Sequence, residues 1–361
     1  MSKSILINLA VLFQKPTGIA TYALNVAKHL QDLNPTLLTA YPQSDFNCYA
    51  IADDMTPAQG SKGHLRRLWW TQSQLPKIWN QLQSDLVYSP LPEAPLFSKC
   101  RSVVMCHDLI PLRFPSRFSP LTNYFRYVVP LVLQQAEHIL CNSESTAQDI
   151  VDFYGIDASK ITPILLAYDR QHFYPRDRLN SASTRPYFLY LGRQDPYKNI
   201  ARLISAFADL PDRANYDLYL AGARDPRFAP ELEQQIAELE ITHQVKWLNY
   251  IDYQELPSLL SNALALVFPT LWEGFGLPVL EAMACGTPVI TSNLASLPEV
   301  TGDAAILIDP YDTRAITSAM NEIAGDSKRR SQLSQLSLAR AKLFSWQQTG
   351  EQTKEVLERF I

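Results

Sequence analysis

The sequence of 361 residues lacks several features that mark particular classes of protein. No apolar run approaches the roughly 18 residues that a membrane-spanning helix needs, which argues against an integral membrane protein. The formal net charge is only -4, so the chain as a whole has no basic character that would indicate nucleic-acid binding. Only 12 glycines occur, and the chain has no repeats or low-complexity tracts, which argues against a solenoid or a disordered tail.

Cysteine is also sparse. The five cysteines are an odd number, and no two have the spacing of a metal site; they are Cys48, Cys100, Cys106, Cys141 and Cys285. Most lie in apolar surroundings, so we expect buried free thiols and a reducing compartment. Residues 5–13 read as a first strand, with no small-residue cleavage site after them, so we expect no export signal and a cytoplasmic protein.

Short apolar runs alternate with amphipathic stretches along the whole chain. Apolar residues after Gly18 recur with the spacing of one helix face. The expected strands lie near residues 5–12, 86–89, 102–106 and 138–142, and then at 187–192, 216–222, 245–250, 263–268, 288–292 and 304–308. Almost fully apolar strands joined by helices predict parallel sheets covered on both faces, which is an α/β fold.

Residues 173–186, rich in proline, serine and charge, interrupt this alternation and indicate a linker. The chain then divides into two Rossmann-like domains, residues 1–172 and 173–344. Ligands of such folds bind at the carboxyl ends of the strands, so two domains facing one another would form a central cleft. Functional motifs are therefore expected directly after strands.

The first motif, residues 268–290, follows an expected strand. Gly274 and Gly276 let a ligand approach the backbone, and Pro278 favours a helix start whose N–H groups attract an anion. Glu281 lies about one turn into this helix, where its carboxylate suits a diol such as ribose, and Glu273 stays on the loop. The alternative is an ordinary loop salt bridge at Glu273 and a favourable helix-dipole contact at Glu281.

The second motif, residues 189–200, places Gly192, Arg193 and Lys198 after another strand, with a helix beginning near Asn199. Two cations at the carboxyl end of a strand suit a diphosphate that leaves with developing negative charge. The alternative is a solvated basic turn.

Together the two motifs resemble glycosyltransferase family 4, whose members are retaining enzymes of the GT-B architecture. The resemblance rests on Gly192-Arg193 with Lys198, and on Glu273 and Glu281 separated by seven residues within EGFGLPVLEAMACGTPVI. Residues 344–346 also resemble the start of the family's C-terminal helix, which crosses back to the first domain. The resemblance covers nearly the whole chain and implies two Rossmann-like domains around a central cleft, with residues 345–361 packed on the first.

The resemblance also implies roles in donor binding. Arg193 and Lys198 would neutralise the donor diphosphate, and Glu273 would contact the sugar near its 3-hydroxyl. Glu281 would hold the ribose hydroxyls. Backbone groups would contact the sugar and phosphate at Phe275, Gly276 and Leu277, and the base at Asn249 and Tyr250.

In the N-terminal half, the resemblance implies that Gly18 allows close backbone approach to the phosphate; the alternative is a simple turn. Thr17 departs from the family, which often has two glycines here. His107 ends a strand, and a histidine at this point faces the donor sugar in similar enzymes, where an imidazole exchanges protons near physiological pH. Asp108 is a candidate to orient the ring, and a purely structural histidine is the alternative. We expect Ser143 to cap a helix.

Residues 60–126 hold nine Lys and Arg against three Asp and Glu, together with Trp69, Trp70, Trp79 and Phe97. Such a surface suits an anionic bilayer or a lipid diphosphate acceptor, which would place the protein on the inner face of the membrane. The alternative is a solvated face over core tryptophans.

These features predict a retaining glycosyltransferase that moves a hexosyl group from a nucleotide sugar, of the UDP-glucose or GDP-mannose type, to a glycan or lipid-linked acceptor. Arg193, Lys198, Glu273 and His107 are the predicted catalytic residues. No Asp-x-Asp pair occurs, so we expect no metal and no other cofactor. A nucleotide-sugar epimerase of the same fold, or a non-catalytic nucleotide-sugar binding protein, are the alternatives.

Overall fold

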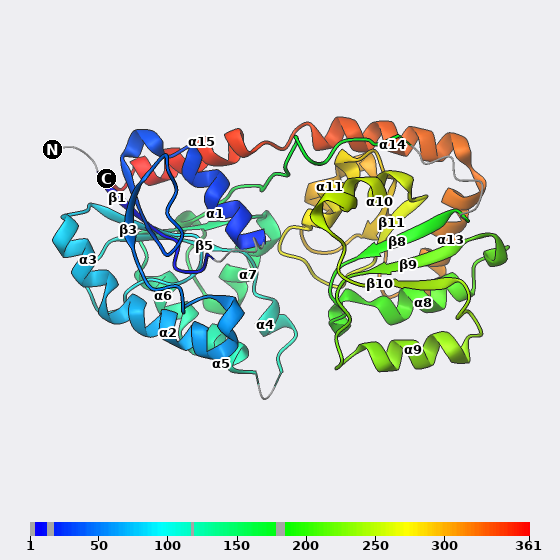
Figure 1. Ribbon diagram of the computed structural model, residues 1–361, viewed down its shortest axis with the longest axis horizontal. Coiled ribbons are helices and arrows are strands. Elements are labelled where there is room, and N and C mark those ends of the chain that lie inside the picture. Colours follow the sequence, from blue (N-terminus) through cyan, green and yellow to red (C-terminus); the bar gives the residue numbers. More distant parts are fainter. Residues whose placement is uncertain (1–3, 13–17, 117–118, 178–184) are drawn as a thin grey trace. The chain divides into compact units, whose positions relative to one another are not determined.

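The computed structural model describes residues 4–12, 18–116, 119–177 and 185–361 (Figure 1). The chain forms two compact units: unit 1 is Met1–Leu166 with Ser345–Ile361, and unit 2 is Ala167–Phe344. Residues 167–172 group with unit 2, whereas the composition predicted a boundary between 172 and 173. Contacts explain the difference, because Arg170 donates hydrogen bonds to the carbonyls of Lys342 and Phe344, and His172 contacts the carbonyl of Tyr253.

Unit 1 is built on a seven-stranded parallel sheet with the strand order β3-β2-β1-β4-β5-β6-β7. The strands are β1 (Ile5–Asn8), β2 (Pro35–Thr39), β3 (Asn47–Ala50), β4 (Leu86–Ser89), β5 (Ser102–Cys106), β6 (His138–Cys141) and β7 (Ile161–Pro163). The helices are α1 (Gly18–Lys28), α2 (Gly60–Ser73), α3 (Leu75–Leu82), α4 (Ile110–Arg113), α5 (Pro120–Tyr127), α6 (Val129–Gln135), α7 (Glu144–Tyr154) and α15 (Trp346–Glu358).

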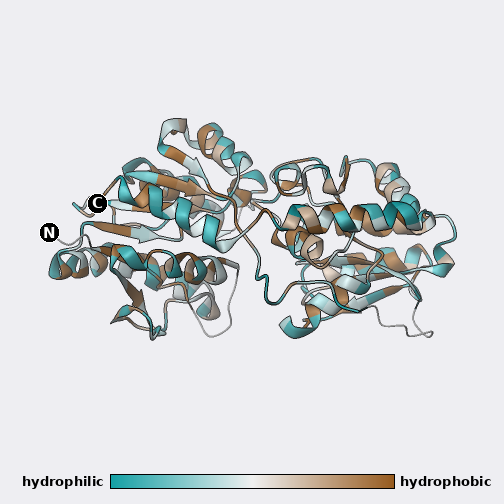
Figure 2. Ribbon diagram, turned by 90° about the horizontal axis from the view of Figure 1, so that it is seen from above, coloured by the Kyte–Doolittle hydropathy of each residue, from teal (hydrophilic) through white to brown (hydrophobic). Residues whose placement is uncertain are grey.

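The core of unit 1 lies on both faces of this sheet. On one face, Leu6 and Val87 pack against Trp70 of α2 and helix α3, and β5 and β6 pack against α5, α6 and α7. The alternate strand residues, among them Ile5, Ile7 and Val103, are buried on the other face. Helix α15 packs on α1, so tightly that a Cβ on Gly350 would lie 2.4 Å from the Cβ of His29. The strands of both units are mainly apolar, and the helices carry apolar and polar residues (Figure 2).

Unit 2 is built on a six-stranded parallel sheet with the order β10-β9-β8-β11-β12-β13. The strands are β8 (Tyr187–Leu191), β9 (Asp217–Ala221), β10 (Val245–Leu248), β11 (Ala265–Phe268), β12 (Val289–Ser292) and β13 (Ile306–Ile308). The helices are α8 (Ile200–Ala208), α9 (Ala229–Glu238), α10 (Leu256–Asn262), α11 (Leu277–Ala284), α12 (Leu297–Thr301), α13 (Thr313–Gly325) and α14 (Ser327–Ala341).

The α/β fold with two parallel sheets is confirmed, and each predicted strand is present, several with shorter bounds. Three strands escaped prediction: β2, β3 and β7. The edge strand β3 has a partly exposed, polar sequence, β7 is only three residues long, and β2 begins at a proline, so none shows a clear apolar run.

The strand order reverses beside β8, which lies between β9 and β11. The segments that follow β8 and β11 therefore run to opposite sides of the sheet. Open α/β sheets bind ligands at such a reversal of the strand order. Both sequence motifs lie here, because residues 192–199 follow β8 and residues 269–276 follow β11.

All five cysteines carry free thiols, and all but Cys48 are buried. Within the described residues, no helix is both long and apolar enough to cross a membrane.

Candidate functional site

The loops that follow β8 and β9 touch each other through two glycines. Gly192 has a φ of 154°, and a Cβ there would lie 3.0 Å from the Tyr190 hydroxyl, which donates to the carbonyl of Arg193. Gly222 has a φ of 145°, and a Cβ there would lie 2.1 Å from the Gly192 carbonyl oxygen. Side chains are thus excluded where these two loops meet.

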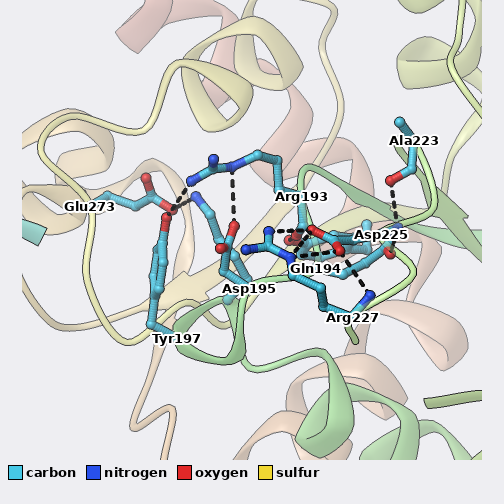
Figure 3. Close-up of polar contacts among 10 residues, drawn as sticks. Arg193, Gln194, Asp195, Tyr197, Ala223, Asp225, Arg227 and Glu273 are labelled. Carbon is cyan, nitrogen blue, oxygen red and sulfur yellow. Dashed lines mark hydrogen bonds and ion pairs between the residues drawn. The ribbon is translucent and has the colours of Figure 1, made fainter. Parts of the chain in front are cut away.

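Gln194 joins the same two loops by its side-chain amide. Its Nε2 donates to the carbonyl of Ala223 at 3.0 Å, and its Oε1 accepts from the N–H of Asp225 at 2.6 Å (Figure 3). Gln194 is buried. Sequence reasoning missed this residue, because a single glutamine in a loop carries no signal of a long-range contact.

Arg193 projects from this fixed loop toward solvent. Its Nε lies 3.1 Å from a carboxylate oxygen of Asp195, and its Nη2 donates to the Tyr197 hydroxyl at 3.1 Å (Figure 3). The Arg193 side chain is still 74% exposed. A guanidinium that is oriented on one edge and open to solvent suits an incoming phosphate.

Lys198 and Glu273 form an ion pair with each other. The lysine Nζ lies 2.5 Å from Oε1 of Glu273, and the two side chains are only 12% and 11% exposed. Tyr197 and Phe268 place their rings within 5.2 and 5.4 Å of the same Nζ. Lys198 and Glu273 thus contact each other, whereas the sequence predicted that Lys198 contacts the diphosphate and Glu273 the sugar.

Asn199 holds Lys198 in place. It adopts a left-handed conformation with a φ of 63°, and its buried Nδ2 donates to the carbonyls of Pro269 and Pro310 at 2.9 and 2.7 Å. One side chain thus links the loops after β8, β11 and β13. This fixes the backbone from which the lysine reaches Glu273.

The glycine loop after β11 ends at the N-terminus of helix α11. Gly276 precedes the helix with a φ of 99°, and a Cβ there would lie 2.7 Å from Leu297. The Ser296 hydroxyl lies 3.0 and 2.9 Å from the carbonyls of Glu273 and Phe275, which holds the loop in shape. The helix begins at Leu277, one residue before the predicted start at Pro278.

Glu281 lies within α11, with its side chain partly exposed. Desolvation by burial raises the pKa of its carboxyl to about 8. Desolvation is the sole cause of this shift, so within the described part of the chain no hydrogen bond or ion pair compensates the burial of the carboxylate. A ligand with hydroxyl groups would supply the missing hydrogen bonds.

Asn249 and Tyr250 form the exposed turn after β10, at the edge of the same sheet. Tyr250 is 77% exposed. Their backbone is accessible to a ligand at the carboxyl ends of the strands, and the role in base binding stays a prediction.

His107, in unit 1, follows β5. Its Nε2 lies 3.0 Å from the carbonyl of Pro90 and must carry a hydrogen, because a carbonyl oxygen only accepts. The Tyr22 ring packs edge-on at 5.0 Å, and desolvation lowers the pKa of the imidazole to about 4. The ring is therefore neutral at physiological pH, unlike the proton-exchanging group that the sequence suggested. Asp108 does not orient it through this Nε2; its carboxylate accepts from the N–H of Ile110.

Two further residues of unit 1 carried predictions. Gly18 is the exposed first residue of α1, while Thr17 lies outside the described residues. Ser143 accepts a hydrogen bond from the N–H of Thr146 at the start of α7, which confirms the predicted helix cap.

Helix α2 carries part of the basic, aromatic stretch. Leu65, Arg66 and Trp69 are exposed on one face of the helix, together with Lys62. Arg67 is buried instead, with its Nε 2.7 Å from Glu93, so it contributes no surface charge. Of the remaining aromatic residues, Phe97 is exposed, Trp70 is buried and Trp79 is partly buried.

Comparison with known proteins identifies the family to which the chain belongs. Residues 16–172 match the family model described as Glycosyltransferase Family 4, and residues 175–337 match the one described as Glycosyl transferases group 1. The chain is 33% identical over 266 residues to O-antigen chain mannosyltransferase B of Escherichia coli, a match that covers 70% of this chain and 69% of that protein. The chain belongs to glycosyltransferase family 4.

Two further comparisons agree with this family 4 glycosyltransferase. The O-antigen chain mannosyltransferase RfbU of Salmonella typhimurium is 31% identical over 220 residues, which cover 61% of this chain and 60% of that protein. The structure of Anabaena Alr3699/HepE in complex with UDP and glucose superposes with a TM-score of 0.75 at 21% identity, covering 99% of this chain and 100% of that one. The fold of the glycosyltransferase is therefore GT-B.

Proposed function

We propose that this glycosyltransferase transfers mannose, with retention of configuration, from a nucleotide-activated mannose of the GDP-mannose type to a glycan or lipid-linked acceptor in polysaccharide synthesis. The observation that carries the proposal is that Arg193 and the Lys198–Glu273 pair both lie where the strand order of unit 2 reverses, with Tyr197 in contact with both cations. Mannose is preferred among hexoses because the relatives with 33% and 31% identity are mannosyltransferases.

In the proposed complex, the diphosphate lies between the exposed Arg193 guanidinium and the N-terminus of α11. Side-chain cations and helix N–H groups stabilise the charge that develops on the leaving phosphate. Since no carboxylate is an evident nucleophile, we propose attack on the same face of the sugar, with the leaving phosphate oxygen taking the acceptor proton. No metal takes part in this scheme.

The Lys198–Glu273 pair has to open for the donor to bind in this way. The diphosphate replaces Glu273 as the partner of the lysine, and the freed carboxylate accepts a hydrogen bond from a sugar hydroxyl near the 3-position. Both charges keep a partner throughout, which avoids leaving either one buried and unpaired.

The other residues complete the donor site. Glu281 accepts hydrogen bonds from the ribose hydroxyls, which favours its ionised form, and the turn at Asn249 and Tyr250 contacts the base through the main chain. His107 has its Nε2–H occupied by Pro90, so its Nδ1 is an acceptor for a hydroxyl of the sugar and the ring is no acid.

The proposed activity is tested by donor hydrolysis and transfer across a panel of nucleotide sugars. We expect GDP-mannose to be turned over fastest and the transferred sugar to keep its α-anomeric configuration, which NMR of the product reports. Arg193→Ala should lower kcat/KM about a hundredfold or more, whereas Arg329→Ala, which removes an arginine of α14 paired with Glu322 of α13, should not. Preferred turnover of UDP-glucose, or formation of an epimer from donor alone, would refute the proposal.

We further propose that the exposed face of α2 contacts an anionic membrane. Leu65 and Trp69 lie beside Lys62 and Arg66 there, which combines apolar side chains with positive charge. Arg66 also pairs with Asp54 at 3.0 Å, so Lys62 carries the unbalanced part of this charge. Trp69→Ala and Arg66→Glu should each weaken binding to liposomes that contain phosphatidylglycerol, and Lys328→Glu on α14 should not. Binding that survives high salt and both substitutions would count against this surface.

A further inference from the structure

Asp195 lies in the loop of residues 192–199 that follows β8, and the proposed mechanism gives this carboxylate no role. It stands two positions after Arg193, and its Oδ2 lies 3.1 Å from the guanidinium Nε (Figure 3). The Asp195 side chain is only 18% exposed. A carboxylate so close to a phosphate-binding cation repels every anion that the cation binds.

The contact between the two groups is mainly electrostatic. The same Oδ2 is shielded from solvent and makes no hydrogen bond within the described residues, so the ion pair lacks good hydrogen-bond geometry. The Tyr197 hydroxyl, in contrast, accepts a hydrogen bond from Nη2 of Arg193. Orientation of the guanidinium therefore depends more on Tyr197, and Asp195 contributes chiefly its negative charge.

The surrounding charges are balanced in the same way. Asp225 accepts hydrogen bonds from Arg227, which holds the pKa of that carboxyl low, at about 2, and Arg193 adds to the effect. Arg193 and Arg227 thus face two carboxylates, and Lys198 faces Glu273. No cation of this cluster meets a nucleoside diphosphate without a neighbouring carboxylate that repels it.

We infer that Asp195 is a counterion that limits how tightly Arg193 holds the nucleoside diphosphate, and so speeds release of this product. The inference rests on the proposed function, in which the diphosphate is both part of the donor and the leaving product. A glycosyltransferase has to release that product in every cycle, and a dianion held by unopposed cations would dissociate slowly.

The test is the affinity of Asp195→Asn for GDP and UDP, measured by calorimetry. The asparagine keeps the size of the side chain and removes the charge. We expect the Kd of the diphosphate that the wild type binds better to fall about threefold, the effect of one unit charge on another roughly 6 Å away in aqueous surroundings. The gain should shrink at high salt, and guanosine or uridine should bind as before.

Two further variants complete the test. Glu322→Gln removes a carboxylate from the exposed pair with Arg329 on α13 and α14, so it controls for net charge and should leave both affinities unchanged. Tyr197→Phe should weaken diphosphate binding, because it removes the hydrogen bond that orients Arg193. The direction of the change in Kd thus distinguishes a counterion from an orienting residue.

An unchanged or weaker affinity of Asp195→Asn would overturn the inference, and a weaker one would make Asp195 a residue that orients Arg193. The same holds if Glu322→Gln gives an equal gain, because the effect would then be one of net charge. A wild-type protein that binds neither GDP nor UDP would overturn the proposed function itself, and the inference with it. If the wild type binds a diphosphate tightly and Asp195→Asn shows no gain in affinity, the inference fails and the proposed function stands.

Discussion

The ion pair between Lys198 and Glu273 makes a prediction that separates stability from catalysis. Removing one partner leaves the other charge nearly buried and unpaired, which costs about 3–5 kcal/mol in proteins. Because each side chain keeps about a tenth of its exposure, we expect the lower end, about 3 kcal/mol, for Lys198→Met. Unit 2 spans residues 167–344, so its melting temperature should fall by about 6–12 °C.

The double variant Lys198→Met with Glu273→Gln removes both charges at once. An uncharged pair of similar size has no buried ion, so its free energy of unfolding should lie within about 1 kcal/mol of the wild type. Activity should not return with stability. Without the lysine the leaving diphosphate loses a fixed cation, and we expect kcat/KM to stay about a thousandfold down in the single and double variants.

The assay combines thermal unfolding with donor turnover for the wild type, both single variants and the double variant. Two results would refute the reasoning. A double variant as unstable as Lys198→Met would show that the unpaired carboxylate is not the cause of the instability. A double variant that regains activity would show that Lys198 serves the fold and does not bind the diphosphate.

Three further predictions follow from single residues. Gly222→Ala places a Cβ against the Gly192 carbonyl and should lower the free energy of unfolding by about 2 kcal/mol in urea titrations, whereas Gly325→Ala, with no atom within 4 Å of its Cβ, should not; equal effects would contradict the contact. Glu281 has a folded pKa of about 8 against an ordinary value of 4.5, so the folded state binds more protons than the unfolded state between these values and stability falls as pH rises. Glu281→Gln should therefore stabilise the free protein at pH 8 by roughly 4 kcal/mol and not at pH 4, and a gain that is the same at both pH values would refute this. His107 is neutral above about pH 5, so His107→Asn should lower kcat about tenfold without changing how kcat depends on pH between 5.5 and 8. If the wild type shows a titration near pH 6.5 that the variant lacks, the ring does titrate in this range.

Local features of the donor site were predictable from the sequence. The strands before the two loops are nearly uninterrupted apolar runs, and such runs form buried parallel strands with little ambiguity. Gly276 and Pro278 mark the start of α11 to within one residue, because few residues tolerate a positive φ or lack the N–H that the first turn leaves unbonded.

Contacts between distant residues could not be predicted in the same way. Lys198 and Glu273 are 75 positions apart, and Arg67 and Glu93 are 26 apart. Nothing local distinguishes these charges from solvated ones, since their burial is decided by which loops the sheet brings together. For the same reason the count of basic residues in 60–126 included the buried Arg67, and sequence reasoning missed Gln194, whose amide matters only because the loop after β9 lies beside it.

The packing of α15 against α1 makes unit 1 discontinuous along the chain. Trp346 approaches the ring of Tyr22, Lys354 pairs with Asp32, and the Thr349 hydroxyl donates to the carbonyl of Leu165. During synthesis, the ribosome therefore makes all of unit 2 before the last helix of unit 1 exists. Until α15 is made, one side of α1 has no helix packed on it. All residues of unit 2 are synthesised before unit 1 is complete, so unit 2 is able to fold first.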